Sequence, residues 1–332
     1  MKMLPPEWEQ LWECTRSGNE VTDEVTFHAL EWLYDNRTKK GTWFHNPFRV
    51  EKKNKQGQFR LISWAGPQLS IVHLAISRWL KHEYVRKSMD ASTPGAGGVM
   101  VALRAHGDNK FVTLVDVANA FSSVSERSLS AALRCLMDDV TEEFLDVLLE
   151  LTTVDGHVWQ GWSVSKDLFN LVMLNLDPVV FDQLPFLGVE IYTRYVDNLI
   201  FSSSKPYSPI TLERFLRHVF KQCGFLLGPF QHSDQGRYSY LGVMVEEGNY
   251  RPQDVKRYVV EIEKALQHPC PHLYYWTILG YFSWTLSVSR DNIPKELFEV
   301  FERYFKLVGM IPPALQRLMI MRYQMSFADL QN

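Results

Sequence analysis

The sequence predicts an α+β protein in which a region of mixed strands and helices is followed by a region that is wholly helical. Hydrophobic residues make up 46% of the 332 residues and aromatic residues 13%, as in folded globular proteins. Apolar runs of strand length lie at 111–117 and on both sides of Asp197, whereas the apolar spacing beyond Arg251 is helical. The length allows one large core and two or three subdomains.

The first part of the chain carries helical and extended patterns in turn. Apolar residues at helical spacing predict helix over 5–34, and a strong amphipathic stripe predicts another helix over 68–86. Between them, 48–63 alternates and has Lys-Gln-Gly near its middle, which predicts a β-hairpin. A glycine-rich loop follows at 94–98.

The middle of the chain holds two apolar runs that each lead to a carboxylate. The near-continuous run 111–117 predicts a strand that carries Asp116. The runs around Asp197 and Asn198 predict two strands joined by a tight Asp-Asn turn, because both residues tolerate the positive φ of hairpin turns. The other expected elements are helices at 125–136, 142–151, 165–176 and 211–223, and a strand at 238–245.

The charge of the chain is unevenly distributed. A net charge of −3 is low for a protein that grips a nucleic acid duplex through its phosphates. Between Asn36 and Arg60, however, eight Lys or Arg stand against one acid, Glu51. Such a run is often only a solvated face, but it also suits a polyanionic ligand.

The cysteines and the N-terminus predict a cytoplasmic protein. No apolar run is long enough to span a membrane, and the first residues lack the apolar core of a signal peptide. The four cysteines are widely spaced without a CxxC pair. We therefore expect reduced, mostly buried thiols rather than a disulfide framework or a zinc site.

Asp116 and Asp197 are suited to metal-dependent nucleotidyl transfer. That chemistry uses two divalent cations about 4 Å apart, and Mg²⁺ is held by a few carboxylates together with substrate phosphates and water. Carboxylates at two adjacent strand ends supply the minimum protein contribution. Taken alone, either residue is more simply explained as a cap or turn residue, so the functional interpretation depends on the neighbouring blocks.

Three blocks resemble the palm of reverse transcriptases. The first, 116–121, reads Asp-Val-Ala-Asn-Ala-Phe and is similar to the family's first carboxylate block. The second, 159–165, is similar to the Pro-Gln-Gly-x-x-x-Ser-Pro block, although Trp159 and Lys166 replace its prolines. The third, 195–198, reads Tyr-Val-Asp-Asn where the family has Tyr-x-Asp-Asp.

The resemblance implies a role for each matching residue. Asp116, Asp197 and Asn198 would form the catalytic group, and the two Mg²⁺ ions would lie at Asp116, Val117 and Asp197. The remaining residues would bind the incoming nucleotide. Phe121 would be the steric gate that excludes a 2′-hydroxyl, Gln160 would contact the nucleotide, and Gly161 would allow close backbone approach.

The resemblance extends over roughly 48–307. Lys53 and Arg60 resemble the fingers residues that hold the triphosphate, which places the basic cluster against a polyanion. The segment Tyr240-Leu241-Gly242 resembles the primer grip, and the helical region after Arg251 resembles the thumb. The implied architecture is a right-hand polymerase fold with fingers, a ferredoxin-like (RRM-like) palm and a helical thumb. The expected domains are an N-terminal helical extension (1–47), fingers (48–110), palm (111–250, with a fingers segment around 125–165) and thumb (251–332).

Two positions depart from the family pattern. Asn198 replaces a carboxylate by an uncharged amide, so metal affinity should fall and Mn²⁺ should become relatively favoured. The family places a Lys seven residues after the glycine that corresponds to Gly224, and here that position is Gln231. The next residue, His232, is a candidate general acid, with an exposed loop histidine of no catalytic role as the alternative.

These features are similar to those of prokaryotic reverse transcriptases of the retron or phage-defence type. We expect an RNA-directed DNA polymerase that extends a primer with dNTPs in an antiphage defence system, without membrane association and without an RNase H or maturase domain. Its expected partners are an RNA template or non-coding RNA, the DNA product, and a second protein subunit or another reverse transcriptase.

Two alternatives stay open. One is an inactive pseudo-reverse transcriptase that scaffolds an RNA or a partner polymerase. The other is a retron enzyme that makes msDNA, although of the retron Asn-Ala-x-x-His block only His106 is present.

Overall fold

The computed structural model describes residues 4–38, 48–53, 59–87, 98–137, 140–290 and 292–323. Side chains are not described for 48–61, 84–87 and 322–323. The chain divides into two compact units, each built from separate stretches of sequence. The first unit comprises Met1–Gly98, Thr113–Ser202 and Tyr207–His232, and the second comprises Val99–Val112, Ser203–Pro206 and Ser233–Asn332.

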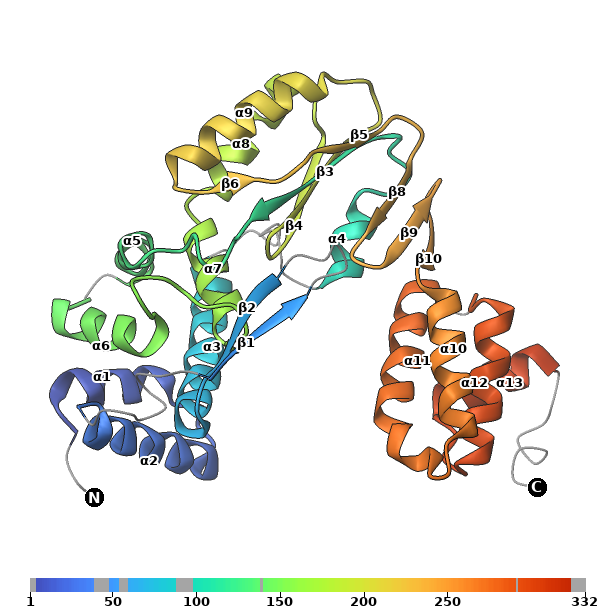
Figure 1. Ribbon diagram of the computed structural model, residues 1–332. Coiled ribbons are helices and arrows are strands. Elements are labelled where there is room, and N and C mark those ends of the chain that lie inside the picture. Colours follow the sequence, from blue (N-terminus) through green and yellow to red (C-terminus); the bar gives the residue numbers. More distant parts are fainter. Residues whose placement is uncertain are drawn as a thin grey trace. The chain divides into compact units, whose positions relative to one another are not determined.

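The sheet of the first unit positions both candidate carboxylates. Its strands follow the order β4-β5-β3-β6, and β7 also pairs with β3. Because β3 lies between β5 and β6, the strand that carries Asp116 is directly beside the strand that begins at Asn198 (Figure 1). The bounds are β3 (Phe111–Ala118), β4 (Ile191–Tyr195), β5 (Asn198–Ser203), β6 (Leu226–Leu227) and β7 (Gln231–Ser233).

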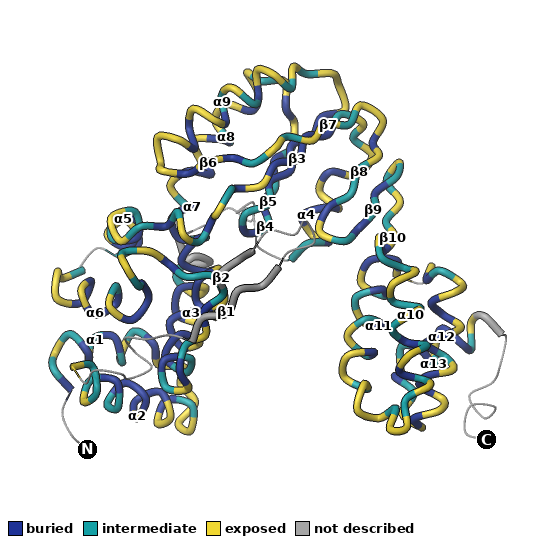
Figure 2. Tube along the Cα trace, viewed as in Figure 1, coloured by how far each residue is buried: buried dark blue, intermediate teal, exposed yellow. Residues whose placement is uncertain are grey.

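Helices cover this unit and enclose a large apolar core. The long helix α3 (Pro67–Lys87) contacts five other helices, and α8 and α9 lie together on one side of the sheet (Figure 1). The inward faces of the helices and of β3 and β5 are buried (Figure 2). The other helices are α1 (Pro6–Thr15), α2 (Glu20–Asn36), α5 (Glu126–Leu136), α6 (Glu142–Thr152), α7 (Ser165–Met173), α8 (Asp177–Leu187) and α9 (Pro209–Gln222).

The predicted N-terminal hairpin is confirmed. Strand β1 (Phe48–Lys53) pairs antiparallel with β2 (Phe59–Trp64), and the register sets Lys52 opposite Arg60. Near the end of β2, Ser63 N donates a hydrogen bond to Gln160 O at 2.9 Å. The hairpin is thereby attached to the loop that contains the candidate nucleotide-binding residues.

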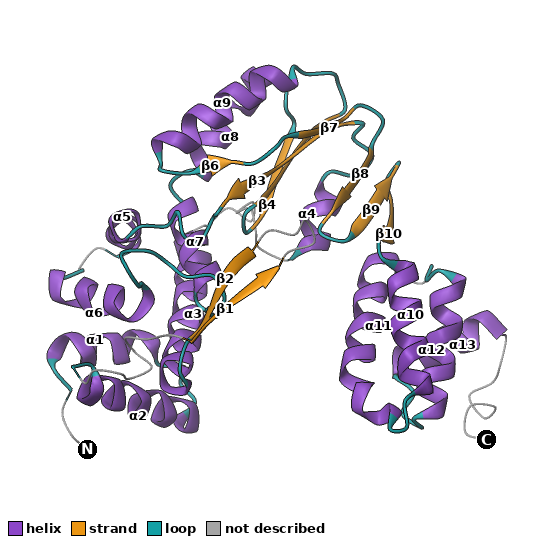
Figure 3. Ribbon diagram, viewed as in Figure 1, coloured by secondary structure: helices purple, strands orange, loops and turns teal. Residues whose placement is uncertain are grey.

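The second unit combines a small sheet with a helical bundle (Figure 3). Its sheet has the order β10-β9-β8, and its bundle is held by a core of aromatic and aliphatic side chains. The elements are α4 (Val99–Ala105), β8 (Arg237–Tyr240), β9 (Val243–Glu246), β10 (Asn249–Pro252), α10 (Val255–Gln267), η1 (Pro271–Tyr274), α11 (Tyr275–Ser289), α12 (Lys295–Leu307) and α13 (Pro313–Tyr323).

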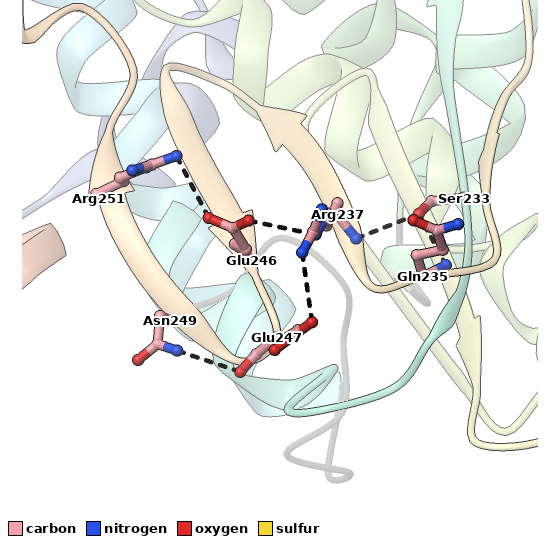
Figure 4. A network of polar contacts seen from close by, with 7 residues as sticks. All are labelled: Ser233, Gln235, Arg237, Glu246, Glu247, Asn249 and Arg251. Atoms are coloured by element: carbon pink, nitrogen blue, oxygen red, sulfur yellow. Dashed lines mark hydrogen bonds and ion pairs between the residues drawn. The ribbon is translucent and has the colours of Figure 1, made fainter.

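Charged side chains cross the face of this small sheet. Arg237 on β8 pairs with Glu246 at 3.2 Å and with Glu247 at 3.6 Å, and Glu246 also pairs with Arg251 at 3.4 Å (Figure 4). All four side chains are more than a third exposed, so solvent screens these pairs and each adds little stability. The pairs stabilise the alignment of the strands more than the unit as a whole.

The wholly helical C-terminal region and the helices expected in the middle of the chain are confirmed, but the structure differs from the expected elements in four respects. The single strand expected at 238–245 is two strands, β8 and β9, joined by a turn at Leu241 and Gly242. The region 5–34 is two helices, because Gly18 has φ +78° and Asn19 caps α2 through a bond from Thr22 N. The helix at 165–176 ends at Met173, and α8, which was not expected, begins at Asp177.

The remaining predictions about the chain have mixed outcomes. All four cysteines are free, as expected, but Cys135, Cys223 and Cys270 are exposed, so the prediction of mostly buried thiols is wrong. Of the glycine-rich loop, 94–97 lies outside the described residues. None of the helices described has both the length and the apolar character needed to cross a membrane. The division into extension, fingers, palm and thumb stays a prediction.

Candidate active site

Asp116 and Asp197 line one cavity of 380 Å³ in the first unit. Phe121 and Gln160, which the sequence resemblance assigns to the same site as these carboxylates, line the cavity as well. The described residues that line it are Asp116, Val117, Asn119, Ala120, Phe121, Ser122, Val154, Asp155, His157, Val158, Trp159, Gln160 and Asp197. The structure therefore brings together residues from three separated sequence blocks.

Backbone hydrogen bonds fix the two carboxylate segments to each other. Val117 N donates to Asp197 O at 2.8 Å, which joins β3 to the β4–β5 turn. On the other side, Gly228 N donates to Asp116 O at 2.8 Å. Because main-chain bonds hold both segments, the backbone positions that carry the two carboxylates are fixed relative to each other.

Gly228 lies directly against the carboxylate of Asp116. A Cβ atom added at Gly228 would stand 2.3 Å from Asp116 Oδ1, well inside contact distance. The φ of Gly228 is not in the left-handed region, so only space demands a glycine at this position. The sequence resemblance gave no signal for this residue, because the contact joins distant segments.

The tight turn that carries Asp197 differs from the one predicted. Its central residues are Val196 and Asp197, since Tyr195 pairs with Asn198 and β5 begins at Asn198. Val196 has φ +56°, a conformation that costs a β-branched residue on the order of 1–3 kcal/mol. Its carbonyl accepts a hydrogen bond from Arg194 Nη1 at 2.7 Å, which offsets part of that cost.

Asn198 contacts the carboxylate of Asp197. Its Nδ2 donates a hydrogen bond to Asp197 Oδ1 at 2.9 Å. A carboxylate at this position could not donate such a bond. The amide therefore orients Asp197 while adding no negative charge to the cavity.

Phe121 projects from a turn that follows β3. Asn119 has φ +50°, and its carbonyl accepts from Ser123 N at 3.0 Å, which closes the turn. The Phe121 ring packs edge-on against Phe169, with ring centroids 6.2 Å apart. A ring that is held in this way can exclude bulk from the cavity, as a steric gate requires.

The Gln-Gly loop is held by several bonds. Ser165 Oγ donates to Trp159 O at 2.5 Å, and Trp159 Nε1 donates to Val154 O at 3.1 Å. Gly161 has φ +107°, and a Cβ there would stand 2.5 Å from Ser63 O. Close backbone approach at Gly161 was predicted, and the strand that approaches is β2 of the protein itself.

Asp155 and His157 line the cavity, and neither was expected from the sequence. Asp155 and His157 belong to a tight hairpin in which Val154 and His157 exchange backbone bonds of 2.9 and 3.2 Å. Asp155 has φ +54° and Gly156 has φ +79°, as in a type I′ turn. The Asp-Gly dipeptide is the sequence signal that could have identified this hairpin.

Several predicted site residues do not line this cavity. The side chains of Lys53 and Arg60 lie outside the described part of the chain, so their roles stay predictions. Tyr240, Leu241 and Gly242 belong to the second unit, where Leu241 and Gly242 form the turn between β8 and β9 with φ +47° and +84°.

His232 bonds to the start of β3 rather than lining the cavity. Its Nδ1 lies 3.0 Å from Thr113 Oγ1, which also shares a 2.7 Å hydrogen bond with Tyr207. Burial raises the pKa of Tyr207 to about 12, so that hydroxyl stays neutral. His232 is not among the described residues that line the cavity, and its role as a general acid stays a prediction.

The donor set of the cavity fits divalent cations that are completed by substrate phosphates. Asp116 and Asp197 supply charged oxygen ligands, and the described lining contains no Lys or Arg to neutralise them. Within the described ranges, no group of three or more His, Cys, Asp or Glu side chains could hold a metal ion. Magnesium sites of one or two carboxylates plus phosphate oxygens meet this condition.

The chain is similar to two known proteins, one by sequence and one by structure. Among curated proteins, the retron Se72 reverse transcriptase of Salmonella heidelberg (strain 579083-10) is 28% identical over 103 residues. The match covers 31% of this chain and 27% of that protein. Among solved structures, apo telomerase from Candida tropicalis has a TM-score of 0.54 at 10% identity, covering 82% of this chain and 59% of that chain. No family model matches the chain.

These similarities show a reverse-transcriptase-like fold. The telomerase similarity establishes the fold, since it covers most of this chain. The chain spans less than two thirds of the length of either relative.

Proposed function

We propose that this protein is an RNA-directed DNA polymerase that extends a primer with dNTPs. The observation that carries the proposal is the cavity that collects Asp116, Asp197, Phe121 and Gln160. Carboxylates suit the metal-dependent transfer of a deoxynucleotidyl group from a dNTP to a primer 3′-hydroxyl, with pyrophosphate as the leaving group. A ring that limits volume and an amide suit the selection and orientation of the dNTP. The reverse-transcriptase-like fold supports the same reaction.

Two Mg²⁺ ions, or Mn²⁺, are proposed to be held by Asp116, the Val117 carbonyl and Asp197. When bound, the ions would activate the primer 3′-hydroxyl and neutralise charge on the triphosphate. Asn198 would orient Asp197 through its amide. Because the cavity lining is acidic, the triphosphate also needs cationic partners, and Lys53 and Arg60 are proposed for that role.

The rest of the site is proposed to select and orient the nucleotide. Phe121 would fill the volume that a 2′-hydroxyl needs, and Gln160 would hold the nucleotide in place. The bonds around Trp159 and Ser165 keep the Gln160 loop rigid, which limits the freedom lost when the nucleotide binds.

Primer extension with labelled dNTPs tests the proposal. Purified protein is assayed with Mg²⁺ and with Mn²⁺ on RNA and DNA templates, beside Asp116→Ala and Asp197→Ala. We expect incorporation by the wild type and loss in both variants. No incorporation under any condition, or equal incorporation by the variants, would refute the proposal.

A second candidate function is a pseudo-polymerase that scaffolds an RNA or a partner polymerase. The observation that favours it is Asn198, an amide at the position where the family pattern has a second carboxylate. This candidate predicts binding of RNA or of a partner protein that Asp116→Ala leaves unchanged.

The biological setting is proposed from the sequence and from the retron relative. The 28% identity between this chain and the retron reverse transcriptase supports two settings. One is a retron-type enzyme that makes msDNA, and the other is a related antiphage polymerase that acts in the cytoplasm. Sequencing the nucleic acid that copurifies with the protein distinguishes the retron enzyme from the antiphage polymerase. A covalent RNA–DNA product supports the retron alternative, and protection in a phage plaque assay that Asp116→Ala abolishes supports defence.

A further inference from the structure

The side chain of Arg194 is almost completely buried, next to the turn that carries Asp197. It lies on β4 and is 1% exposed, and its partner Asp177 at the start of α8 is 4% exposed. A buried guanidinium is tolerated only where its charge and its donors are satisfied. The hydrogen-bond partners of the Arg194 N–H groups therefore indicate the role of this residue.

The donors of Arg194 are divided between two tasks. Nε and Nη2 bond to Asp177 Oδ1 at 3.2 Å and Oδ2 at 2.9 Å, which neutralises the charge. Nη1 bonds to Asn170 Oδ1 at 2.6 Å and to the carbonyl of Val196 at 2.7 Å. Tyr192 in turn donates to Asp177 Oδ1 at 2.8 Å, so the carboxylate is also fixed.

The bond to Val196 acts where the turn is strained. A positive φ of 56° suits glycine, not a β-branched residue, so the sequence of the turn does not itself favour this conformation. The bond from Arg194 holds the carbonyl of Val196, and the bond from Val117 N holds the carbonyl of the next residue, Asp197. The turn is therefore fixed at two successive peptide groups.

We propose that the Arg194–Asp177 pair is a positioning device that holds the turn so that Asp197 faces the cavity. Arg194 acts through Val196 and is not itself a catalytic residue. The proposal rests on the proposed function for its effect on rate, but not for its effect on the turn.

Stability alone does not account for this pair. Replacing a buried ion pair by neutral groups of similar volume is often neutral or stabilising. A merely structural pair can therefore be replaced without consequence for the turn, whereas a positioning pair cannot. This difference separates the two explanations.

The test compares Arg194→Met/Asp177→Asn with the wild type. In this double variant no charge is left unpaired, and the amide oxygen introduced by Asp177→Asn still accepts from Tyr192. Arg194→Lys keeps the charge but cannot supply the same fork of donors. Asp23→Asn, a change at another buried carboxylate of the first unit, is the matched control for loss of a buried charge.

Hydrogen exchange of peptides covering 111–121 and 191–201 is the readout that does not require activity. We expect about tenfold faster exchange at the turn in the double variant and in Arg194→Lys, as for loss of a charge-assisted bond, with no change in Asp23→Asn. For nucleotide incorporation we expect kcat to fall about 100-fold, as for a misplaced catalytic group, with the KM for primer–template unchanged.

Adding Val196→Gly gives a rescue that a structural role would not produce. Glycine adopts the positive φ without help, so slow exchange and part of kcat should return in the double-variant background.

Wild-type exchange in a folded double variant overturns the proposal, as does failure of Val196→Gly to slow the exchange. If the double variant does not fold, exchange in Arg194→Lys decides by the same criterion. If the wild type incorporates no nucleotide, the proposed function fails and the exchange data still decide the role of Arg194.

Discussion

The carboxylate of Asp116, an exposed residue of β3, lies directly against Gly228. The absent Cβ of Gly228 leaves the space that Asp116 Oδ1 occupies. On the neighbouring strand, Asn198 donates to Asp197 Oδ1. At the scale of single residues, the site is defined by what orients its two carboxylates as much as by the carboxylates themselves.

Gly228→Ala should displace the carboxylate of Asp116 while the fold is retained. The new methyl would stand 2.3 Å from Asp116 Oδ1, so the side chain must rotate or the strand must shift. We expect kcat to fall about 100-fold, as for catalytic groups misplaced by about 1 Å. Gly280→Ala, where a Cβ meets nothing within 4 Å, is the control and should keep full activity. Equal kinetics for the two variants would show that the contact has no role.

Asn198→Asp should shift the metal preference toward Mg²⁺. The change adds a charged oxygen ligand and removes the amide donor to Asp197 Oδ1. We expect the ratio of Mn²⁺-supported to Mg²⁺-supported rates to fall about tenfold, which corresponds to one stronger ligand interaction of about 1.4 kcal/mol. Rates measured across a titration of each metal check this, and an unchanged ratio contradicts it.

At the scale of elements, the Gln160 loop is fixed between β2 and α3. Ser63 N donates to Gln160 O, and Trp162 Nε1 donates to Ser63 Oγ at 3.1 Å. The Trp162 ring in turn lies 4.8 Å from the ring of His73, which is fully buried on α3. The Gln160 loop, which is proposed to orient the nucleotide, therefore depends on packing of the N-terminal hairpin and α3.

This packing should make the stability of the first unit depend on pH. Burial lowers the pKa of His73 from 6.5 to about 4, so between these values only the unfolded chain binds the proton. The free energy of unfolding should therefore fall as the pH drops from 6.5 toward 4, by about 1.4 kcal/mol per pH unit from this residue. Urea unfolding at several pH values measures the slope.

His73→Gln is the control for the pH dependence. Glutamine can still donate to Leu151 O, the partner of His73 Nε2 at 2.8 Å, but it does not titrate. The variant should lose the His73 part of the slope between pH 6.5 and 4. A slope equal to that of the wild type would mean that His73 is not the group responsible.

Elements were predicted well wherever their signal was local. The hairpin 48–63, helix α3 and strand β3 follow from periodicity within a few residues, and each is confirmed. The positive φ was instead expected at Asp197 and Asn198, whereas the structure has it at Val196. The hydrogen bond that stabilises this conformation comes from the buried Arg194, and Asp177 of α8 neutralises the charge of Arg194. Contacts between distant segments, such as Gly228 against Asp116, leave no periodic pattern in the sequence.

At the scale of the whole molecule, charge is separated along the chain. The net charge is −3, yet eight Lys or Arg stand between Asn36 and Arg60. The described lining of the cavity contains three aspartates and no Lys or Arg. The proposed polyanionic substrate would therefore be bound by metal ions and the basic segment together, rather than by a generally basic surface.

Lys53→Ala and Arg60→Ala should weaken nucleotide binding more than duplex binding. Loss of one phosphate contact is expected to raise the KM for dNTP about tenfold, with a smaller change in the Kd for primer–template. Lys295→Ala, at an exposed lysine of the second unit, is the matched control. If both basic-segment variants bind dNTP as the wild type does, the assignment of these residues is wrong.

Single-turnover incorporation of one dNTP, by the wild type and by the isosteric variants Asp116→Asn and Asp197→Asn, tests the central claim most directly. These variants keep the shape of the cavity and remove one charge each, so hydrogen exchange and Tm should match the wild type while metal binding is lost. We predict incorporation by the wild type with Mg²⁺ or Mn²⁺, and rates at least about 1,000-fold lower in both variants, as for removal of an essential catalytic group. Wild-type rates in either folded variant would contradict a polymerase built on Asp116 and Asp197.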